Sequence, residues 1–265
     1  MDEEPADLTG GYLLEIEKAL HFTQNEEDAG FVTDGSMCVI IKEPSHPGKQ
    51  AVTYISSLVN DFHNAVIAAD GFSKATGKYY ADYIDMHSFA AKVAVEEFCA
   101  NFDVRAASHF FHKDADSVDP LLYAGPGWDY DLTYGNKDDG MRNPEKVNYV
   151  FDRSNDTSHL YHWLLTHEDF RRMTRQVFEE EVLPTAEVLL GRREPSPGSC
   201  LRSIDALQAE IADSAAMNFT RWQAMAIPDI TNESGRTFEA AGSYLKNWIA
   251  VRTETLAAGW LKEEK

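Results

Sequence analysis

The first third of the chain shows two short apolar runs typical of strands and then one apolar stretch with helical spacing. Residues 11–17 and 36–42 are rich in branched and aromatic side chains, and a polar stretch with turn residues separates them. Pro44 and Pro47 then interrupt the chain. From residue 51 to residue 66, apolar side chains recur every three or four positions. The pattern predicts a small antiparallel strand pair followed by one amphipathic helix.

The next apolar segment, residues 89–102, also has helical spacing and is the central element of the chain. We expect Asp85 or Ser88 to cap this helix, because short polar side chains satisfy the free N–H groups of a first turn. Its core-facing stripe is predicted to consist of Val95, Phe98, Cys99 and Phe102.

Two strands are expected after the central helix. The first covers residues 109–111, and the second is formed by residues 121–123 together with residues 128–132. The two would make a hairpin around a pair of acidic residues, Asp129 and Asp131.

The C-terminal half has mainly helical patterns. Residues 136–158 are polar and predict a surface loop. Helical spacing then marks residues 160–182, with Pro184 as the expected end, and the ranges 204–222 and 238–256. The tryptophans of this half are expected to pack in the core; they are Trp163, Trp222, Trp248 and Trp260. The whole pattern predicts an α+β fold that is mainly helical with short antiparallel strands.

Composition and charge narrow the function classes. The chain has 265 residues, of which 24 are basic and 44 acidic, for a net charge of −20. This charge argues against a non-specific nucleic-acid binder, which needs a basic surface. The three cysteines follow no metal-binding spacing. The N-terminus has no basic and apolar leader pattern and no run is long enough to span a membrane, so we expect either an intracellular protein or one whose leader has been removed.

The acidic residues around the central helix suggest a divalent cation site. Asn101 and Asp103 stand at the end of the helix, and Asp129 and Asp131 lie in the expected hairpin, where Asp129 is 129 − 103 = 26 positions beyond Asp103. Converging carboxylates are typical ligands of Mg²⁺. Asp103 and Ser108 are also five positions apart, which is the spacing between the catalytic Asp and a metal-binding residue in protein kinases. The alternative interpretation is that these acids are capping or solvated turn residues.

Several segments resemble the CotH family of atypical kinases, which is named after a spore-coat protein. The matching segments are GGYLLEIE, FVTDG, a strand ending IKEP, YIDMHSF, EEFCANFD, SHFFHKD, GPGWDYDLTYGN, WLLTHEDFRRMTRQVF, NFTRW and LKNWIAVRTETL. They occur in the family's order and approximate spacing and cover nearly the whole chain.

The resemblance implies a kinase-like fold that uses ATP and Mg²⁺ to phosphorylate Ser or Thr of proteins. Carried over to this chain, Asp103 is the catalytic residue and Asp129 the principal metal ligand. Asp131 is a second metal residue, and Asn101 and Ser108 are expected to contact the cofactor. Ser108 stands where many kinase relatives have Asn, which puts a second metal position in doubt.

The resemblance also gives an expected domain organisation. It implies one CotH-kinase-like domain over residues 1–265, with a β-rich remnant at 1–50, a catalytic-type core at 51–135 and a helical part at 136–265. The family's phosphate-binding lysine lies upstream of the GGYLLE strand, so the N-lobe is expected to be largely missing, and Lys42 receives no phosphate-binding role.

Three functional hypotheses follow. The first is an atypical protein kinase, in a truncated or incomplete version, that acts on coat or surface proteins. The second is a non-catalytic relative that assembles a spore coat or cell surface through protein partners. A metal-dependent hydrolase is disfavoured, because no histidine accompanies the acids at ligand spacing. By resemblance, the protein is expected at the cell envelope, in the spore coat or outside the cell, and the sequence leaves its oligomeric state open.

Overall fold

The computed structural model describes residues 7–24, 29–101, 103, 107–136, 143–146, 159–222 and 237–261. The chain divides into two compact units. The first unit comprises residues 1–93, 103–130 and 150–174, and the second comprises residues 94–102, 131–149 and 175–265. Each unit is described by itself below.

The first unit contains a five-stranded antiparallel sheet in the order β2-β3-β1-β4-β5. The strands are β1 (Tyr12–Glu17), β2 (Gly30–Val32), β3 (Cys38–Glu43), β4 (His109–Lys113) and β5 (Leu122–Ala124). The antiparallel pairing of β1 with β3 confirms the strand pair that the sequence predicts. The fold is therefore α+β, as expected.

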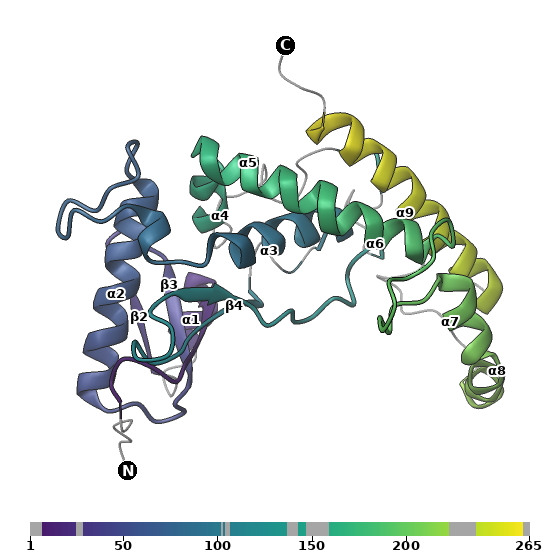
Figure 1. The fold of residues 1–265 in the computed structure, drawn as a ribbon. Coiled ribbons are helices and arrows are strands. Elements are labelled where there is room, and N and C mark those ends of the chain that lie inside the picture. The colour runs from purple at the N-terminus through teal and green to yellow at the C-terminus, as the bar shows by residue number, and fades with distance from the viewer. Residues whose placement is uncertain are drawn as a thin grey trace. The chain divides into compact units, whose positions relative to one another are not determined.

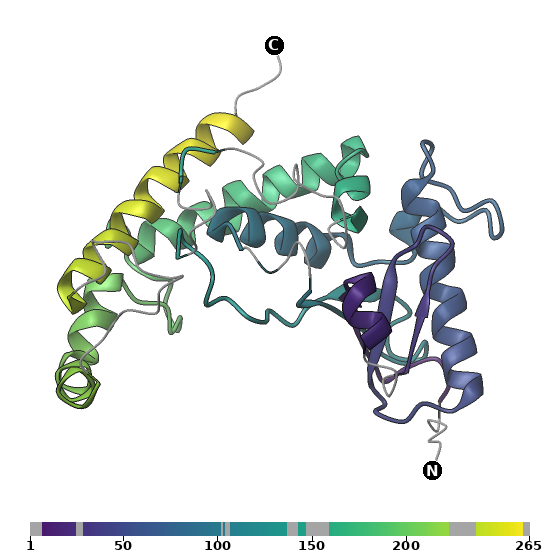
Figure 2. The same cartoon turned by 180° about the vertical axis from the view of Figure 1, so that it is seen from behind.

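Helix α2 (Lys49–Ile67) packs along one face of this sheet, as both views show (Figures 1 and 2). Tyr12 of β1 contacts this helix, since its ring stacks on Tyr54 and its hydroxyl donates to the Ala51 carbonyl. The side chains of Leu14, Ile55 and Phe62 are completely buried. The unit also holds α1 (Ala19–Gln24), the 3₁₀ turn η1 (Tyr80–Asp82), α4 (His159–Leu164) and the beginning of α5 (Glu168–Val177).

Helix α3 (Met86–Cys99) is the predicted central helix and contributes residues to both units. Of the two expected caps, Asp85 is the one used, because its carboxylate accepts the Ser88 N–H at 2.7 Å. The predicted core stripe is correct for Phe98 and Cys99 but wrong for Val95, which is 38% exposed. Phe102 lies outside the described residues.

The error at Val95 has a physical cause. The buried side of α3 includes two acidic side chains, Glu96 and Glu97, which are 0% and 1% exposed. A stripe drawn through the apolar residues alone is therefore rotated away from the true core face.

The expected hairpin is only partly correct. Strand β5 pairs with β4 as predicted, but residues 128–132 form no strand. Asp129 has a φ of 61°, in the left-handed region, which a strand cannot accommodate. The predicted surface loop at 136–158 lies mostly outside the described residues.

The helical stretch that begins with α5 continues past Pro184, contrary to the predicted end. A π-helical turn, η3 (Phe178–Val182), follows α5 and leads directly into α6 (Leu183–Leu189). Proline lacks an N–H and its ring crowds the preceding turn of an α-helix. A wider π turn just before Pro184 gives the ring room, so the helix is not interrupted.

The predicted helix at 204–222 is in fact two short helices, α7 (Ile204–Glu210) and α8 (Ala212–Arg221). No residue of α8 is buried, and Trp222 is 63% exposed, so the prediction of a core position for Trp222 is wrong. The last predicted helix is confirmed as α9 (Phe238–Trp260), which packs on α6 and α7 and buries Trp248.

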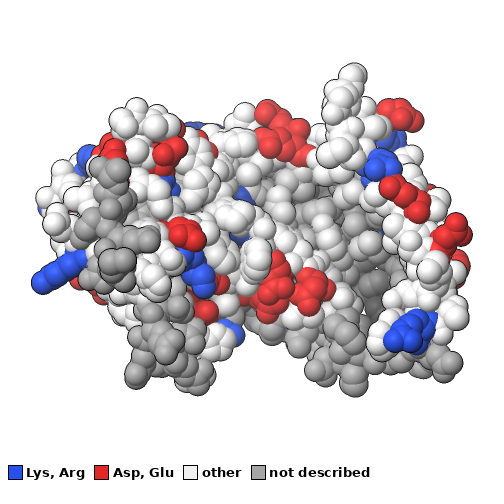
Figure 3. All heavy atoms as spheres, turned by 90° about the horizontal axis from the view of Figure 1, so that it is seen from below, with Lys and Arg blue, Asp and Glu red and all other residues white. Residues whose placement is uncertain are grey.

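The surface carries many charged groups. On the face drawn in Figure 3, acidic side chains gather in several groups, with basic side chains among them.

The three cysteines are free, two of them buried and Cys200 exposed. In the part of the chain that the structure describes, no helix is long and apolar enough to cross a membrane.

Candidate metal site

The end of α3 is tightly fixed just before the predicted catalytic residues. The Ala100 N–H donates to the Glu97 carbonyl at 3.2 Å, and the Asn101 N–H donates to the Glu96 carbonyl at 3.1 Å. This pair of bonds is a Schellman motif, which needs a left-handed residue after the helix. Ala100 takes that place with a φ of 49°, where glycine is the usual residue. Asn101 is 1% exposed, so its amide is held inside the second unit.

The loop after β5 carries the other acidic residues. It begins with a cis Gly125–Pro126 bond, and Trp128 follows with 58% of its surface exposed. The Trp128 ring packs edge-on against Phe110 of β4, with the ring centres 6.0 Å apart. Asp129 comes next in the left-handed conformation, which aspartate tolerates better than most residues do.

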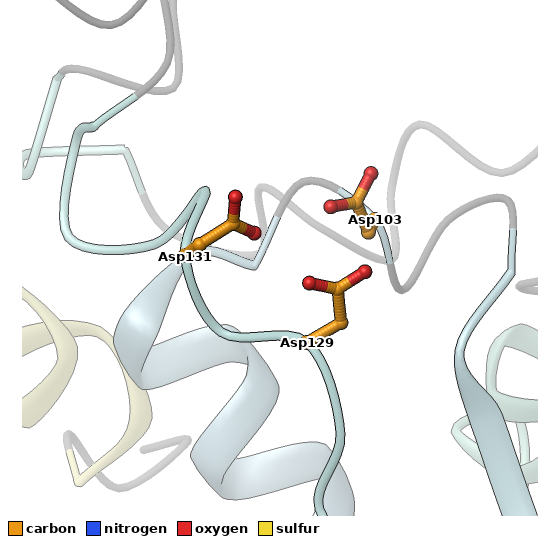
Figure 4. Close-up of side chains that lie close together, drawn as sticks. All are labelled: Asp103, Asp129 and Asp131. Atoms are coloured by element: carbon orange, nitrogen blue, oxygen red, sulfur yellow. The ribbon is translucent and has the colours of Figure 1, made fainter.

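Asp103 and Asp129, both of the first unit, lie close together although 26 residues separate them in the chain (129 − 103 = 26). Each offers a carboxylate oxygen, and these atoms lie within 4.8 Å of one another. Asp131 is the third acidic residue of the group, and it follows Asp129 by two positions in the same loop (Figure 4). Asp103 is half-buried, whereas Asp129 and Asp131 are exposed.

The donor set of this group fits a hard divalent cation. Carboxylate oxygens bind Mg²⁺ at about 2.0–2.1 Å and Ca²⁺ at about 2.3–2.6 Å, so two ligands of one ion lie up to roughly 4–5 Å apart. The acidic oxygens of Asp103 and Asp129 are within that range. Two carboxylates at this distance also repel each other when no cation is present.

A buried lysine supports the acidic loop. Lys92 of α3 is 7% exposed, and its Nζ lies 3.5 Å from the Tyr130 hydroxyl and 5.6 Å from the centre of the Tyr130 ring. Tyr130 stands between Asp129 and Asp131, so this contact holds the backbone of the loop. Sequence reasoning missed Lys92, because a lysine inside an apolar helix gives no sign of its partner.

Ser108, predicted to contact the cofactor, is 7% exposed and has a φ of 65°. Its backbone N–H donates to the carboxylate of Glu15 on β1. Burial raises the pKa of Glu15, and the nearby Lys42 ammonium, 3.3 Å away, partly offsets this shift. Lys42, for which no phosphate-binding role is expected, is thus the ionic partner of Glu15. The contact ties the segment after Asp103 to the central strand of the sheet.

Residues with a strained backbone are concentrated in the segments that carry the predicted site. Among the described residues, five non-glycine residues have a positive φ, and four of them fall between positions 100 and 134. They are Ala100, Ser108, Asp129 and Tyr134. Such conformations cost energy and persist mainly where a fixed geometry is needed, as at active sites.

Within the first unit the structure therefore brings together Asp103 and Asp129, with Asp131 two positions further along the chain, and it buries Asn101 and Ser108. A comparison with protein-family models matches the family described as CotH kinase protein over residues 8–256. No curated protein matches the chain. The matched range covers most of the chain and includes all five predicted site residues. The chain belongs to the CotH kinase family.

Proposed function

We propose that this kinase-like domain transfers the γ-phosphoryl group of ATP to Ser or Thr hydroxyls of proteins, with Mg²⁺ as the metal. The observation that carries the proposal is the proximity of Asp103 and Asp129 within 4.8 Å, in a chain that the CotH kinase family matches over most of its length. Kinases place one catalytic Asp and one metal-binding Asp around the transferred phosphoryl group, and the two come from different loops.

Each acidic residue has a separate role in this proposal. Asp103, which is half-buried, orients the substrate hydroxyl and accepts its proton. Asp129 and Asp131 are exposed and would hold the metal, which neutralises phosphate charge when bound. The hydrogen bond between Ser108 and Glu15 keeps the segment that follows Asp103 in place.

The acceptor class is part of the proposal. The family description supports a protein substrate, and we propose a coat or surface protein rather than a small molecule. A location at the cell envelope or in the spore coat goes with that substrate. If the chain does not transfer phosphate, the alternative is a non-catalytic relative that assembles such a coat.

The proposal is tested by incubating the purified chain with γ-labelled ATP, Mg²⁺ and a library of Ser- and Thr-containing peptides. We expect label on hydroxyl side chains, and a loss of about a hundredfold or more for Asp103→Asn and Asp129→Asn. Asp213→Asn, at an exposed position of α8, is the matched control and should retain full transfer. Absence of transfer by the wild-type chain, or equal transfer by all variants, would refute the proposal.

A further inference from the structure

Arg252 of α9 is completely buried, which is unusual for an arginine. Its Nη2 atom donates to the Glu97 carboxylate at 2.8 Å, and both partners are almost fully shielded from water. Burial lowers the pKa of Arg252, while the Glu97 carboxylate opposes that shift. An arginine remains charged under such conditions, so the pair is a buried ion pair.

Most of the hydrogen bonds from Arg252 go to the main chain rather than to the acidic partner. Its Nε donates to the carbonyls of Glu97 and Phe98 at 3.2 and 3.3 Å, and its Nη2 also reaches the Glu97 carbonyl. Its Nη1 donates to the carbonyls of Pro144 and Lys146. The guanidinium therefore satisfies the last carbonyls of α3, where a positive charge also matches the helix dipole.

A second residue of α9 acts on the neighbouring segment. Trp248 lies one helical turn before Arg252 and packs edge-on against Tyr134, with the ring centres 5.7 Å apart. The Tyr134 N–H donates to the Cys99 carbonyl at 2.7 Å. Together these contacts give the carbonyls of Glu97, Phe98 and Cys99 defined partners. All of these residues belong to the second unit.

We propose that Arg252 is a positioning residue: it fixes the carbonyl end of α3 and thereby the start of the loop that carries Asn101 and Asp103. The proposal rests on the proposed function, because it assigns Arg252 to the same site. Asn101 follows Glu97 by four positions and Asp103 follows it by six, so a shift of the helix end moves both residues. Small displacements of catalytic groups are costly, since a misplacement of about 1 Å can reduce the rate by about a hundredfold.

A simpler role for Arg252 is to neutralise Glu97, and two variants separate the possibilities. Arg252→Lys keeps the positive charge but has no planar fork to reach two carbonyls at once. Glu97→Gln removes the negative charge but leaves every bond from Arg252 to the main chain possible. The positioning role predicts that the lysine variant is affected and the glutamine variant is not, whereas charge neutralisation predicts the reverse. Glu254→Gln, at an exposed position of the same helix, is the control.

The test measures amide hydrogen exchange of peptides covering residues 97–103, at the same interval below each variant's melting temperature. We expect exchange about tenfold faster in Arg252→Lys and near wild-type in Glu97→Gln and Glu254→Gln. In the phosphotransfer assay, kcat of Arg252→Lys should fall about tenfold with KM for ATP unchanged. Wild-type exchange in Arg252→Lys, or faster exchange in Glu97→Gln alone, would overturn the proposal. If the wild-type chain transfers no phosphate, the proposed function fails, and the exchange data still decide whether Arg252 fixes this segment.

Discussion

Asp129 combines an exposed carboxylate with a left-handed backbone, and both properties determine what can replace it. Asparagine tolerates the same conformation and has the same shape, so Asp129→Asn changes little except the charge. In metal-free buffer we expect this variant to melt at or above the wild-type temperature, because it removes repulsion from Asp103. With millimolar Mg²⁺ the order should reverse, because only the wild-type site gains stability from binding.

This reversal is measured by thermal unfolding in EDTA and in MgCl₂. Asp213→Asn is again the control, and it should follow the wild type in both buffers. An Asp129→Asn variant that gains as much stability from Mg²⁺ as the wild type would contradict the metal role of Asp129.

The Asp169 carboxylate makes the stability of the fold depend on pH. Its carboxylate accepts hydrogen bonds from Tyr80 at 2.6 Å and Tyr79 at 3.0 Å. Partial burial alone would raise the pKa of Asp169, but these bonds lower it below the usual 3.8. A lowered pKa in the folded state means that the stabilisation is present above about pH 4 and is lost as the pH falls further. Asp169→Asn should therefore reduce the urea midpoint at pH 7, with a smaller reduction at pH 3.

The control for this pH series is Asp213→Asn, which should lower the midpoint little at either pH. A difference between wild type and Asp169→Asn that grows as the pH falls from 5 to 3 would show that the sign of the pKa shift is wrong.

Contacts with α9 make the replacement of Gly135 costly. Gly135 has a φ of 78°, and a Cβ at this position would lie 2.5 Å from Nε1 of Trp248 and 2.6 Å from the Tyr244 hydroxyl. Gly198 has a similar φ of 84° but open space around it. Gly135→Ala and Gly198→Ala thus share a backbone cost of about 1–2 kcal/mol, and only the first also displaces α9 side chains.

We expect Gly135→Ala to lose about 1–3 kcal/mol more than Gly198→Ala in urea unfolding, because overpacking adds to the backbone cost. Equal losses in the two variants would mean that the loop after Asp131 does not depend on Trp248.

The ion pair between Glu97 of α3 and Arg252 of α9 can be tested by removing one or both charges. Arg252→Met leaves the buried Glu97 carboxylate without its partner, and such losses typically cost about 3–5 kcal/mol. A Glu97→Met, Arg252→Met double variant should recover part of that stability, because no buried charge remains, but the main-chain carbonyls that Arg252 served still lack their donor. Urea unfolding of both variants and of Glu254→Gln measures the difference. A double variant that is less stable than Arg252→Met would contradict this account.

The sequence was informative where a pattern is local. Periodicity placed α2, α9, β1 and β3, and the spacing of the acidic residues predicted that Asp103 and Asp129 lie close together. It failed where distant residues decide the structure. Glu97 and Arg252 are 155 positions apart, so the sequence around Glu97 does not indicate that its carboxylate pairs with a buried guanidinium. The absence of a strand at 128–132 depends on the left-handed backbone of Asp129, which alternating aromatic and acidic residues do not reveal.

At the scale of the whole molecule, the two units are interleaved along the chain. Each is built from three separate segments, and α3 and α5 contribute residues to both. Sequence patterns order the elements but do not show which segments share a core, so this division could not be predicted from periodicity. The net charge of −20 is also a property of the whole chain, and it attracts cations non-specifically. A metal site must therefore be demonstrated against that background.

A Mn²⁺ titration followed by electron paramagnetic resonance measures cation binding by the acidic residues, at about 0.15 M salt to screen the surface charges. We expect one saturable site in the wild-type chain, displaced by Mg²⁺, with affinity reduced about tenfold or more in Asp129→Asn and less in Asp103→Asn. Asp213→Asn should bind like the wild type. Identical Mn²⁺ binding by the wild type and Asp129→Asn would contradict the claim that Asp129 holds a divalent cation at this site.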